Sequence, residues 1–334
     1  MATHKDTPTT ETRLHDDDLA VDSAFGFTRP GFGQSLLAGS VDFYERHIFL
    51  RYKNPNFWPS NFGGEEIDEF PRLLNAAVSL NKANLKRRTR ITLCEGHDAT
   101  GASNVDVLIF PDMIKYRGLE HTDVDSFVEQ VLAKDGKWLN GTPEVLQGSY
   151  VFVCCHAAKD MRCGVCGPAL VRIFKHEIEV NGLQEKVSVC ACSHLGGHKY
   201  AGNVIIFGTS VDGQVTGHWY GYVTPDDVPV LLEEHILKGK IVNQLWRGQM
   251  GQSEEEQKIC HQQRLQATAA DVKKGTDKFK QAQKDESNSS ICSSGGSGKG
   301  CCQQNPNTCC QSTEQTGAYP SSQKTRIENK VSRI

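Results

Sequence analysis

The 334-residue sequence has no apolar run close to the roughly 18–20 residues that a membrane-spanning helix needs. Its N-terminal stretch lacks the apolar core of a secretory signal and the basic character of a transit peptide. The sequence also lacks an excess of either charge, with a formal net charge of −3. Bulk charge therefore gives no reason to expect a nucleic-acid or membrane partner. We expect a soluble, cytoplasmic protein without an integral membrane segment.

Cysteine, by contrast, is abundant. Thirteen cysteines without a secretory signal argue for metal or redox chemistry in a reducing compartment and against a disulfide scaffold. Six of them, with four histidines, fall between residues 154 and 202. Thiolate sulfur and neutral imidazole nitrogen are the ligands that zinc and iron–sulfur centres take. This stretch is therefore the candidate metal site.

The length suits two domains with tails. Residues 1–24 are polar and acidic, which predicts a disordered leader, and residues 25–148 read as an N-terminal α/β lobe. In this lobe the apolar spacing predicts, in order, an extended or helical piece over 41–50 that runs into a strand, a helix over 65–84, strands over 89–94 and 105–110, and a helix over about 124–134.

A second α/β lobe is predicted over residues 149–252. Its predicted elements are a strand that ends at Cys154, a helix started by Gly167 and Pro168, a strand that delivers Cys190 and Cys192 to its end, strands over 203–208 and 217–223 joined through Asp212 and Gly213, and a helix capped by Asp226 and Asp227. The order β-α-β-loop-β-β-α is that of a thioredoxin-like domain.

The two lobes also share features. Each has a strand that ends in cysteine, at Cys94 and Cys154, and each has a late helix that begins with Asp-Val. These features suggest an internal duplication, with the first lobe a degenerate thioredoxin-like repeat that has lost its ligands.

Residues 253–334 are dominated by Gln, Ser, Lys, Gly and Asn, a composition that buries little apolar area. We expect a mobile, low-complexity tail that carries further cysteines, including Cys301-Cys302 and Cys309-Cys310. The chain ends in Ser332-Arg333-Ile334, a distant variant of the peroxisomal Ser-Lys-Leu signal. This tripeptide makes peroxisomes an alternative to the cytoplasm, and mitochondria are a separate alternative.

Spacing leaves more than one ligand set open. Cys163-x2-Cys166 with His194-x3-His198 has the local spacings of a zinc finger, but 27 residues separate its halves where a finger has about 12–15. Cys154-x8-Cys163 with the same histidines combines a strand end, a helix start and the loop after the next strand. Further thiols stand nearby at Cys155, Cys190 and Cys192.

Three blocks in order, Cys154–Gly164, Ser193–Asn203 and Trp219–Val228, resemble the sucrase/ferredoxin-like family of thioredoxin-like [2Fe–2S] proteins. Weaker similarity covers about residues 25–250. The resemblance implies a [2Fe–2S] cluster whose ligands are Cys154, Cys163, His194 and His198, with Cys166, Cys190 and Cys192 as alternates. Lys159 stands where many members have arginine, a departure that touches no ligand.

Such a cluster would serve one-electron transfer. Four thiolates leave an oxidised [2Fe–2S] site doubly negative, whereas two thiolates and two neutral imidazoles leave it uncharged and easier to reduce. The reduction potential is about −150 to +300 mV for two-histidine Rieske sites, against about −400 mV for plant-type ferredoxins. A histidine ligand can lose its outer proton, so the potential should depend on pH. We expect an electron carrier with a redox partner protein and no substrate-converting site. In particular, no motif supplies the carboxylate pair of a sucrase.

Two other functions remain open. Cys163 and Cys166, at a helix start, resemble the dithiol of a thiol–disulfide oxidoreductase. The proline usual before a late strand in such folds is absent, because Ala201 and Gly202 precede that strand. The other alternative is a zinc-stabilised interaction module. Colour separates these alternatives from a red-brown iron–sulfur protein.

Overall fold

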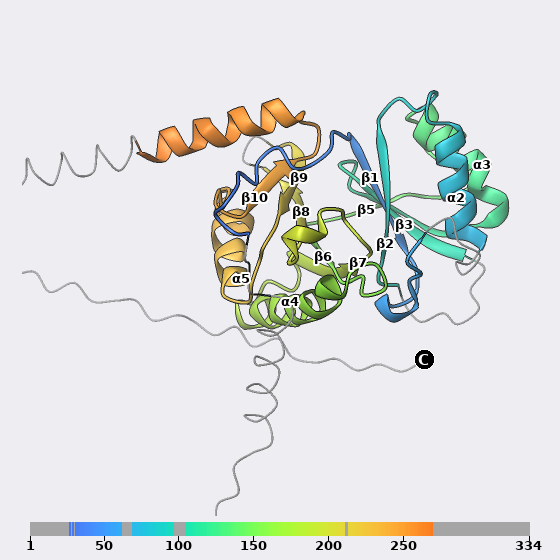
Figure 1. Cartoon of the computed structure of the whole chain (residues 1–334). Coiled ribbons are helices and arrows are strands. Elements are labelled where there is room, and N and C mark those ends of the chain that lie inside the picture. Colours follow the sequence, from blue (N-terminus) through green and yellow to red (C-terminus); the bar gives the residue numbers. More distant parts are fainter. Residues whose placement is uncertain are drawn as a thin grey trace, which may run out of the picture. The chain divides into compact units, whose positions relative to one another are not determined.

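Ten strands form a single mixed sheet in the computed structural model, which describes residues 27, 29, 31–61, 69–96, 104–210 and 213–269 (Figure 1). All of these residues belong to one compact unit within Met1–Thr276. The strands are β1 (Arg46–Arg51), β2 (Thr89–Cys94), β3 (Asn104–Phe110), β4 (Ile114–Glu120), β5 (Glu144–Val145), β6 (Ser149–Cys154), β7 (Val187–Cys192), β8 (Val204–Thr209), β9 (Val215–Tyr220) and β10 (Trp246–Gln249). Across the sheet they follow the order β10-β9-β8-β6-β7-β2-β1-β3-β4-β5.

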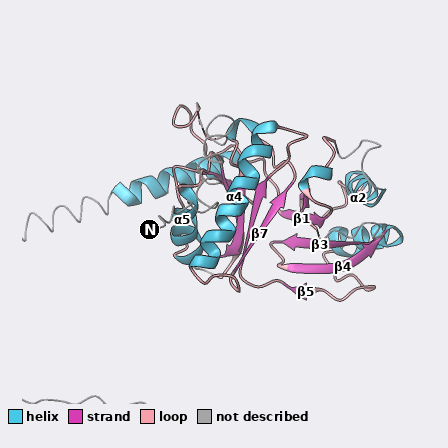
Figure 2. Cartoon of the chain, turned by 90° about the horizontal axis from the view of Figure 1, so that it is seen from below, coloured by secondary structure: helices cyan, strands magenta, loops and turns pink. Residues whose placement is uncertain are grey.

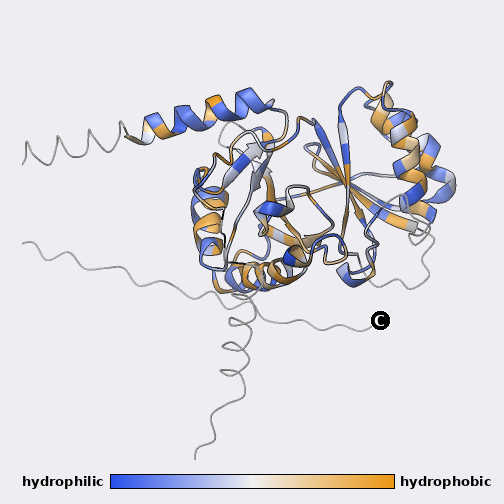
Figure 3. Cartoon of the chain, in the orientation of Figure 1, coloured by the Kyte–Doolittle hydropathy of each residue, from blue (hydrophilic) through white to orange (hydrophobic). Residues whose placement is uncertain are grey.

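The principal helices are amphipathic and cover the sheet (Figure 3). They are α2 (Glu69–Leu80), α3 (Val124–Phe127), which continues as the π-helical η3 (Val128–Ala133), α4 (Met161–Val180) and α5 (Asp227–Val230), which continues as η5 (Leu231–Leu237). Short 3-10 turns are η1 (Pro55–Phe57), η2 (His121–Asp123) and η4 (His198–Tyr200). None of the helices in the described ranges is long and apolar enough to span a bilayer.

The two halves of the sheet have the same connectivity. In the first, β1 pairs in parallel with β2 and antiparallel with β3, and β3 pairs with β4; a helix, α2, joins β1 to β2. In the second, β6 pairs in parallel with β7 and antiparallel with β8, and β8 pairs with β9; α4 joins β6 to β7. Because β2 corresponds to β7, Cys94 corresponds to Cys192. The expected match of Cys94 with Cys154 was therefore wrong, and Arg51 occupies the position of Cys154 in the first half.

The strands bury alternate residues on opposite faces, as the two-residue period of a strand requires. Ile48 of β1 and Val151 of β6 share one apolar cluster with residues of α2, α3, α4 and α5. The next residues along, Phe49 and Phe152, pack on the other face. Helix α4 lies against β6 and β7 on the helical face (Figure 2).

The face opposite the helices is strongly curved. Strands β2 and β7 separate β1 from β6, a distance of about 14 Å along a flat sheet. Nevertheless, the ring centroids of Phe49 and Phe152 lie 3.6 Å apart with an interplanar angle of 7°. The sheet therefore curls around an aromatic cluster, to which Phe110 and Phe207 also belong. Cys154 and Cys163 are buried in the same cluster.

Most expected elements are present. The predicted strands over 89–94 and 105–110, the strand that ends at Cys154 and the late helices are confirmed. The helix expected over 65–84 ends earlier, at Leu80, and its expected start lies outside the described residues. Strands β4, β5 and β10 were not anticipated. The leader, Asp212 and the chain beyond residue 269, with its cysteines and its C-terminal tripeptide, lie outside the described residues.

The expected start of the helix at Gly167 was wrong. Helix α4 begins at Met161, and Asp160 caps it by accepting a hydrogen bond from the backbone N–H of Arg162 at 3.0 Å. Pro168 lies inside the helix, where it gives up one backbone hydrogen bond. An aspartate cap therefore sets the start more than a turn earlier than proline suggested, and this places Cys163 in the first turn.

The expectation of a mobile tail from residue 253 was also wrong at its beginning. Residues 254–269 form a helix, which we call the C-terminal helix. Most of its surface is hydrophilic (Figure 3), but Gln257 is fully buried and donates a hydrogen bond to the carbonyl oxygen of Val41 at 2.9 Å. A Cβ atom at Gly248 would lie 2.0 Å from Oε1 of Gln257. A glycine in β10 thus makes room for this contact.

Candidate metal centre

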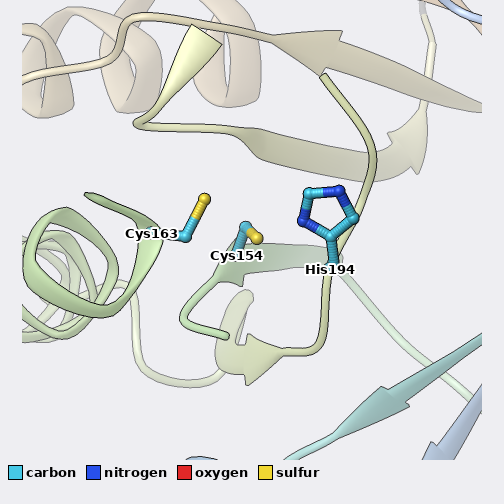
Figure 4. Close-up of side chains that lie close together, drawn as sticks. All are labelled: Cys154, Cys163 and His194. Atoms are coloured by element: carbon cyan, nitrogen blue, oxygen red, sulfur yellow. The ribbon is translucent and has the colours of Figure 1, made fainter. Parts of the chain in front are cut away.

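Three candidate ligands from separate elements meet at one point. Cys154 ends β6, Cys163 lies in the first turn of α4, and His194 follows β7. Their ligand atoms all lie within 4.8 Å of one another, and the side chains converge on a common space (Figure 4). Both cysteines are buried and His194 is half-buried. The structure thus brings together three of the four predicted ligands.

The fourth, His198, lies at the start of η4, but its side chain is outside the described part of the chain. Its backbone position is four residues after His194, at the end of the same loop. Its role as a ligand therefore stays a prediction.

Two glycines allow α4 to approach the end of β6 closely. A Cβ atom at Gly167 would lie 2.3 Å from the carbonyl oxygen of Cys154, and one at Gly164 would lie 2.4 Å from Cβ of Ala157. Contacts this short do not occur between real atoms, so any larger residue would push the helix away. The glycines next to Cys163 and Cys166 thus hold the Cys163 sulfur near Cys154.

A hydrogen bond joins the two buried thiols. A hydrogen bond from Cys163 holds the pKa of Cys154 well below its ordinary value, and the backbone N–H groups of Leu195 and His156 act in the same direction. The same bond, together with burial, raises the pKa of Cys163. A cation bound by both sulfurs must displace the remaining proton, so metal binding here releases a proton.

The histidine loop is held by two arginines from distant parts of the chain. Arg90 donates a hydrogen bond to the carbonyl oxygen of Leu195 at 2.7 Å. Arg247 is buried and donates to the carbonyl oxygen of Gly196 at 3.3 Å and to Asn203 Oδ1 at 2.7 Å. Burial lowers the pKa of Arg247 to about 10, so the group is still charged at neutral pH. Two positive charges therefore flank the backbone beside His194.

His156 supports the same loop from the other side. Its Nδ1 accepts a hydrogen bond from the backbone N–H of His194 at 3.1 Å, so Nε2 carries the proton and donates to the carbonyl oxygen of Pro59 at 3.1 Å. This agrees with the expectation that His156 hydrogen-bonds beside the site. Asp160 and Arg162 combine a helix cap with an ion pair at 3.0 Å. The role of Arg90 was missed, because an arginine early in a strand, 105 residues before its partner, leaves no local pattern.

The alternative cysteine ligands lie nearby but outside the group of three. Cys166 is buried one turn further along α4, and Cys190 and Cys192 lie on β7. Among the described residues, Cys154, Cys163 and His194 are the set with metal-ligand geometry. Two thiols and an imidazole form a donor set that fits an iron–sulfur cluster or zinc.

Comparisons with known proteins give relatives that match part of this chain. The chain is 41% identical over 100 residues to "Altered inheritance of mitochondria protein 32" of Debaryomyces hansenii, which covers 30% of this chain and 35% of that protein. It is 31% identical over 165 residues to the protein of the same name in Meyerozyma guilliermondii, a match that covers 42% of this chain and 56% of that protein. It is also 31% identical over 158 residues to "Actin patches distal protein 1" of Saccharomyces cerevisiae, a match that covers 42% of this chain and 49% of that protein. These matches span between about a third and just over half of the relatives' lengths.

Among solved structures, a thioredoxin-like [2Fe–2S] ferredoxin from Aquifex aeolicus is 19% identical, with a TM-score of 0.26, and covers 31% of this chain and 94% of that one. A family model described as "Sucrase/ferredoxin-like" matches residues 37–248. This range is more than half of the chain and contains all three candidate ligands that converge in the structure, so the chain belongs to the sucrase/ferredoxin-like family.

Proposed function

We propose that this protein is a one-electron carrier that binds a [2Fe–2S] cluster through Cys154, Cys163, His194 and His198. The observation that carries the proposal is the convergence of two buried thiols and one imidazole from a strand end, a helix start and a loop. Membership of the sucrase/ferredoxin-like family supports it. The cluster would supply reversible one-electron chemistry at a moderate, pH-dependent potential.

The surrounding residues suit that role. Arg90 and Arg247 place positive charge beside the ligand loop, and positive charge favours the reduced, more negative state of a bound redox centre. The burial of Cys154 and Cys163 keeps water from the thiolates and limits hydrolysis of metal–sulfur bonds. Electrons would enter or leave through a partner redox protein, since the described chain offers no second cofactor site.

The two alternatives predict different properties. A zinc-stabilised module would use the same donors without redox chemistry. A thiol–disulfide oxidoreductase would need an accessible sulfur at Cys163 or Cys166, yet both residues are fully buried. Burial therefore favours metal binding over exchange with a protein disulfide.

The domain interpretation belongs to the same proposal. We infer that residues 149–252 form a thioredoxin-like domain and residues 25–148 its degenerate repeat, because β1 to β4 and β6 to β9 have identical connectivity. The repeat has Arg51 where the second domain has Cys154, which accounts for a single site. The compartment is cytoplasmic in this proposal. The relatives' names make mitochondria the alternative, and imaging of a tagged chain decides between them.

Metal and sulfide analysis of protein purified without oxygen tests the proposal directly. We expect a red-brown protein with iron and acid-labile sulfide in equal amounts, and an electron paramagnetic resonance signal that appears on reduction. A colourless protein with stoichiometric zinc would establish the interaction module instead. A colourless, metal-free protein with an active Cys163–Cys166 dithiol would establish the oxidoreductase.

A further inference from the structure

The two halves of the sheet meet at a seam lined with cysteines. Strand β7 of the second half lies next to β2 of the first, and Cys94 and Cys192 are the residues in register there. Cys192 is also in register with Cys154 on its other side. Cys154, Cys192 and Cys94 thus form a row across three neighbouring strands, and all three are buried in one cluster.

A fourth cysteine completes the seam. Cys190 precedes Cys192 by two residues and therefore points to the same face of β7. Its sulfur is hydrogen-bonded to the Cys94 thiol, although the two residues lie far apart in sequence. Neither Cys94 nor Cys190 belongs to the group formed by Cys154, Cys163 and His194.

Backbone hydrogen bonds join the two strands on either side of Cys94 and Cys192. The N–H of Glu95 donates to the carbonyl oxygen of Ala191 at 2.9 Å, and the N–H of Ser193 donates to that of Leu93 at 2.8 Å. Cys192 is the residue directly opposite Cys94, so Cys190 is the diagonal neighbour of Cys94 on the same face of the sheet. The sulfurs of Cys94 and Cys190 already lie in hydrogen-bonding contact, so a bond between them joins two atoms that meet in the folded protein.

We propose that Cys94 and Cys190 are a peroxide-sensitive dithiol, which closes to a disulfide across the seam between the two halves. The proposal does not depend on the iron–sulfur assignment, because neither sulfur is among the proposed ligands. It gives the chain a two-electron redox site next to its candidate metal centre. It also gives the first half of the sheet a chemical role beyond that of a scaffold.

The chemistry starts at Cys190, because this residue is half-buried whereas Cys94 is fully buried. The hydrogen bond from Cys94 and the positive charge of Arg51 lower the pKa of Cys190, which favours the reactive thiolate. The Cys190 thiolate attacks one oxygen of hydrogen peroxide and the O–O bond breaks, which gives a sulfenic acid at Cys190 and a hydroxide ion. The hydroxide takes up the proton that the Cys190 thiol had released and leaves as water. Cys94 then attacks the Cys190 sulfur, its proton goes to the departing hydroxyl, and a second water leaves. In sum, two thiols and one hydrogen peroxide give one disulfide and two waters.

Cys192 is a weaker partner for Cys94 despite its register. It is fully buried, whereas Cys190 is half-buried. A small oxidant therefore reaches Cys190 first. The resulting bond would join β2 to β7 and close a loop of about a hundred residues, which restricts the unfolded chain and stabilises the folded one.

The test is peptide mapping of the full-length protein after brief exposure to hydrogen peroxide and alkylation of the remaining thiols. Trypsin places Cys94 in the peptide 91–115 and Cys190 with Cys192 in the peptide 187–199. We expect these two peptides to be linked without reductant and separate with it, and fragmentation of the linked pair to place the bond on Cys190. The melting temperature of the protein should rise by several degrees on oxidation.

Single serine variants test which cysteines form the bond. Cys190→Ser and Cys94→Ser should each abolish the linked peptide and the rise in melting temperature, whereas Cys260→Ser, which removes another half-buried thiol, should change neither. A bond mapped to Cys192, or oxidation of other cysteines while Cys94 and Cys190 stay reduced, would overturn the proposal. Because fragmentation of the wild-type peptide locates the bond, the outcome does not require any variant to fold.

Discussion

The guanidinium group of Arg90 donates a hydrogen bond to the carbonyl oxygen of Leu195, the residue that follows the candidate ligand His194. The same group lies 4.9 Å from the ring centroid of Trp219 in a cation–π arrangement. A residue of β2, in the first half of the sheet, thereby holds the ligand loop of the second half. The site depends on both halves, although the three converging ligands all come from one.

Replacing Arg90 should therefore weaken metal retention. In Arg90→Gln the loop loses a charged hydrogen bond, and we expect metal affinity to fall by about tenfold, since groups that orient ligands typically contribute that much. The rate of metal release to a chelator measures the effect. Arg88→Gln is the matched control, because Arg88 is an exposed arginine just before the same strand. Equal release rates in both variants would show that the Leu195 contact has no role in binding.

Serine at either ligand cysteine should remove the metal centre. Cys154→Ser or Cys163→Ser replaces a thiolate with a poor hydroxyl ligand, and we expect metal content to fall to a small fraction of wild type. Cys166→Ser is the control, since Cys166 lies one turn further along α4 and outside the converging group. Metal analysis and the visible spectrum report the outcome. If Cys166→Ser loses the metal while Cys154→Ser keeps it, the ligand set is wrong.

The C-terminal helix should contribute to stability through Gln257. Gln257→Ala removes hydrogen bonds to the carbonyl oxygens of Val41 and Gln252, both at 2.9 Å, and leaves buried backbone acceptors unpaired. We expect the free energy of unfolding to fall by about 1–3 kcal/mol. Urea denaturation measures it, with the exposed Glu255→Ala as control. A loss below about 0.5 kcal/mol in Gln257→Ala would show that this helix is dispensable.

The second half should lose stability on mild acidification. Burial lowers the pKa of His235 from 6.5 to about 4, and its Nδ1 lies 2.8 Å from the hydroxyl of Tyr220. The folded protein therefore favours neutral His235, while the unfolded chain binds a proton below pH 6.5. The stabilisation is fully present above pH 6.5 and is lost as the pH falls toward 4, by about 2–3 kcal/mol.

Denaturation of wild type and His235→Gln across this range isolates the effect. The variant should be less stable at neutral pH and show a shallower decline toward pH 4. Burial also lowers the pKa of His218, so part of the wild-type slope should persist in the variant. Parallel declines in the two proteins would contradict the assignment to His235.

The local sequence pattern was enough to predict the features that depend on residues close together in the sequence. Short runs of β-branched and apolar residues predicted β2 and β6, and the cysteines and histidines between residues 154 and 198 indicated a metal site, because a strand end, a helix start and a loop bring such residues together. Two local sequence signals predicted different starts for α4. Proline at position 168 suggested one start, and the Asp160 side chain set another, because it pairs with the backbone N–H of Arg162.

Only the tertiary structure decided what depends on distant residues. Arg90 meets Leu195 across 105 positions, and Cys94 meets Cys190, because β2 and β7 lie side by side in the sheet. The C-terminal helix is fixed to the rest of the fold through Gln257, which is buried and hydrogen-bonded to Val41, 216 positions earlier. Composition and periodicity predict the secondary structure of a segment and which of its faces is buried. Strand order in the folded sheet determines which residues far apart in the sequence come within bonding distance.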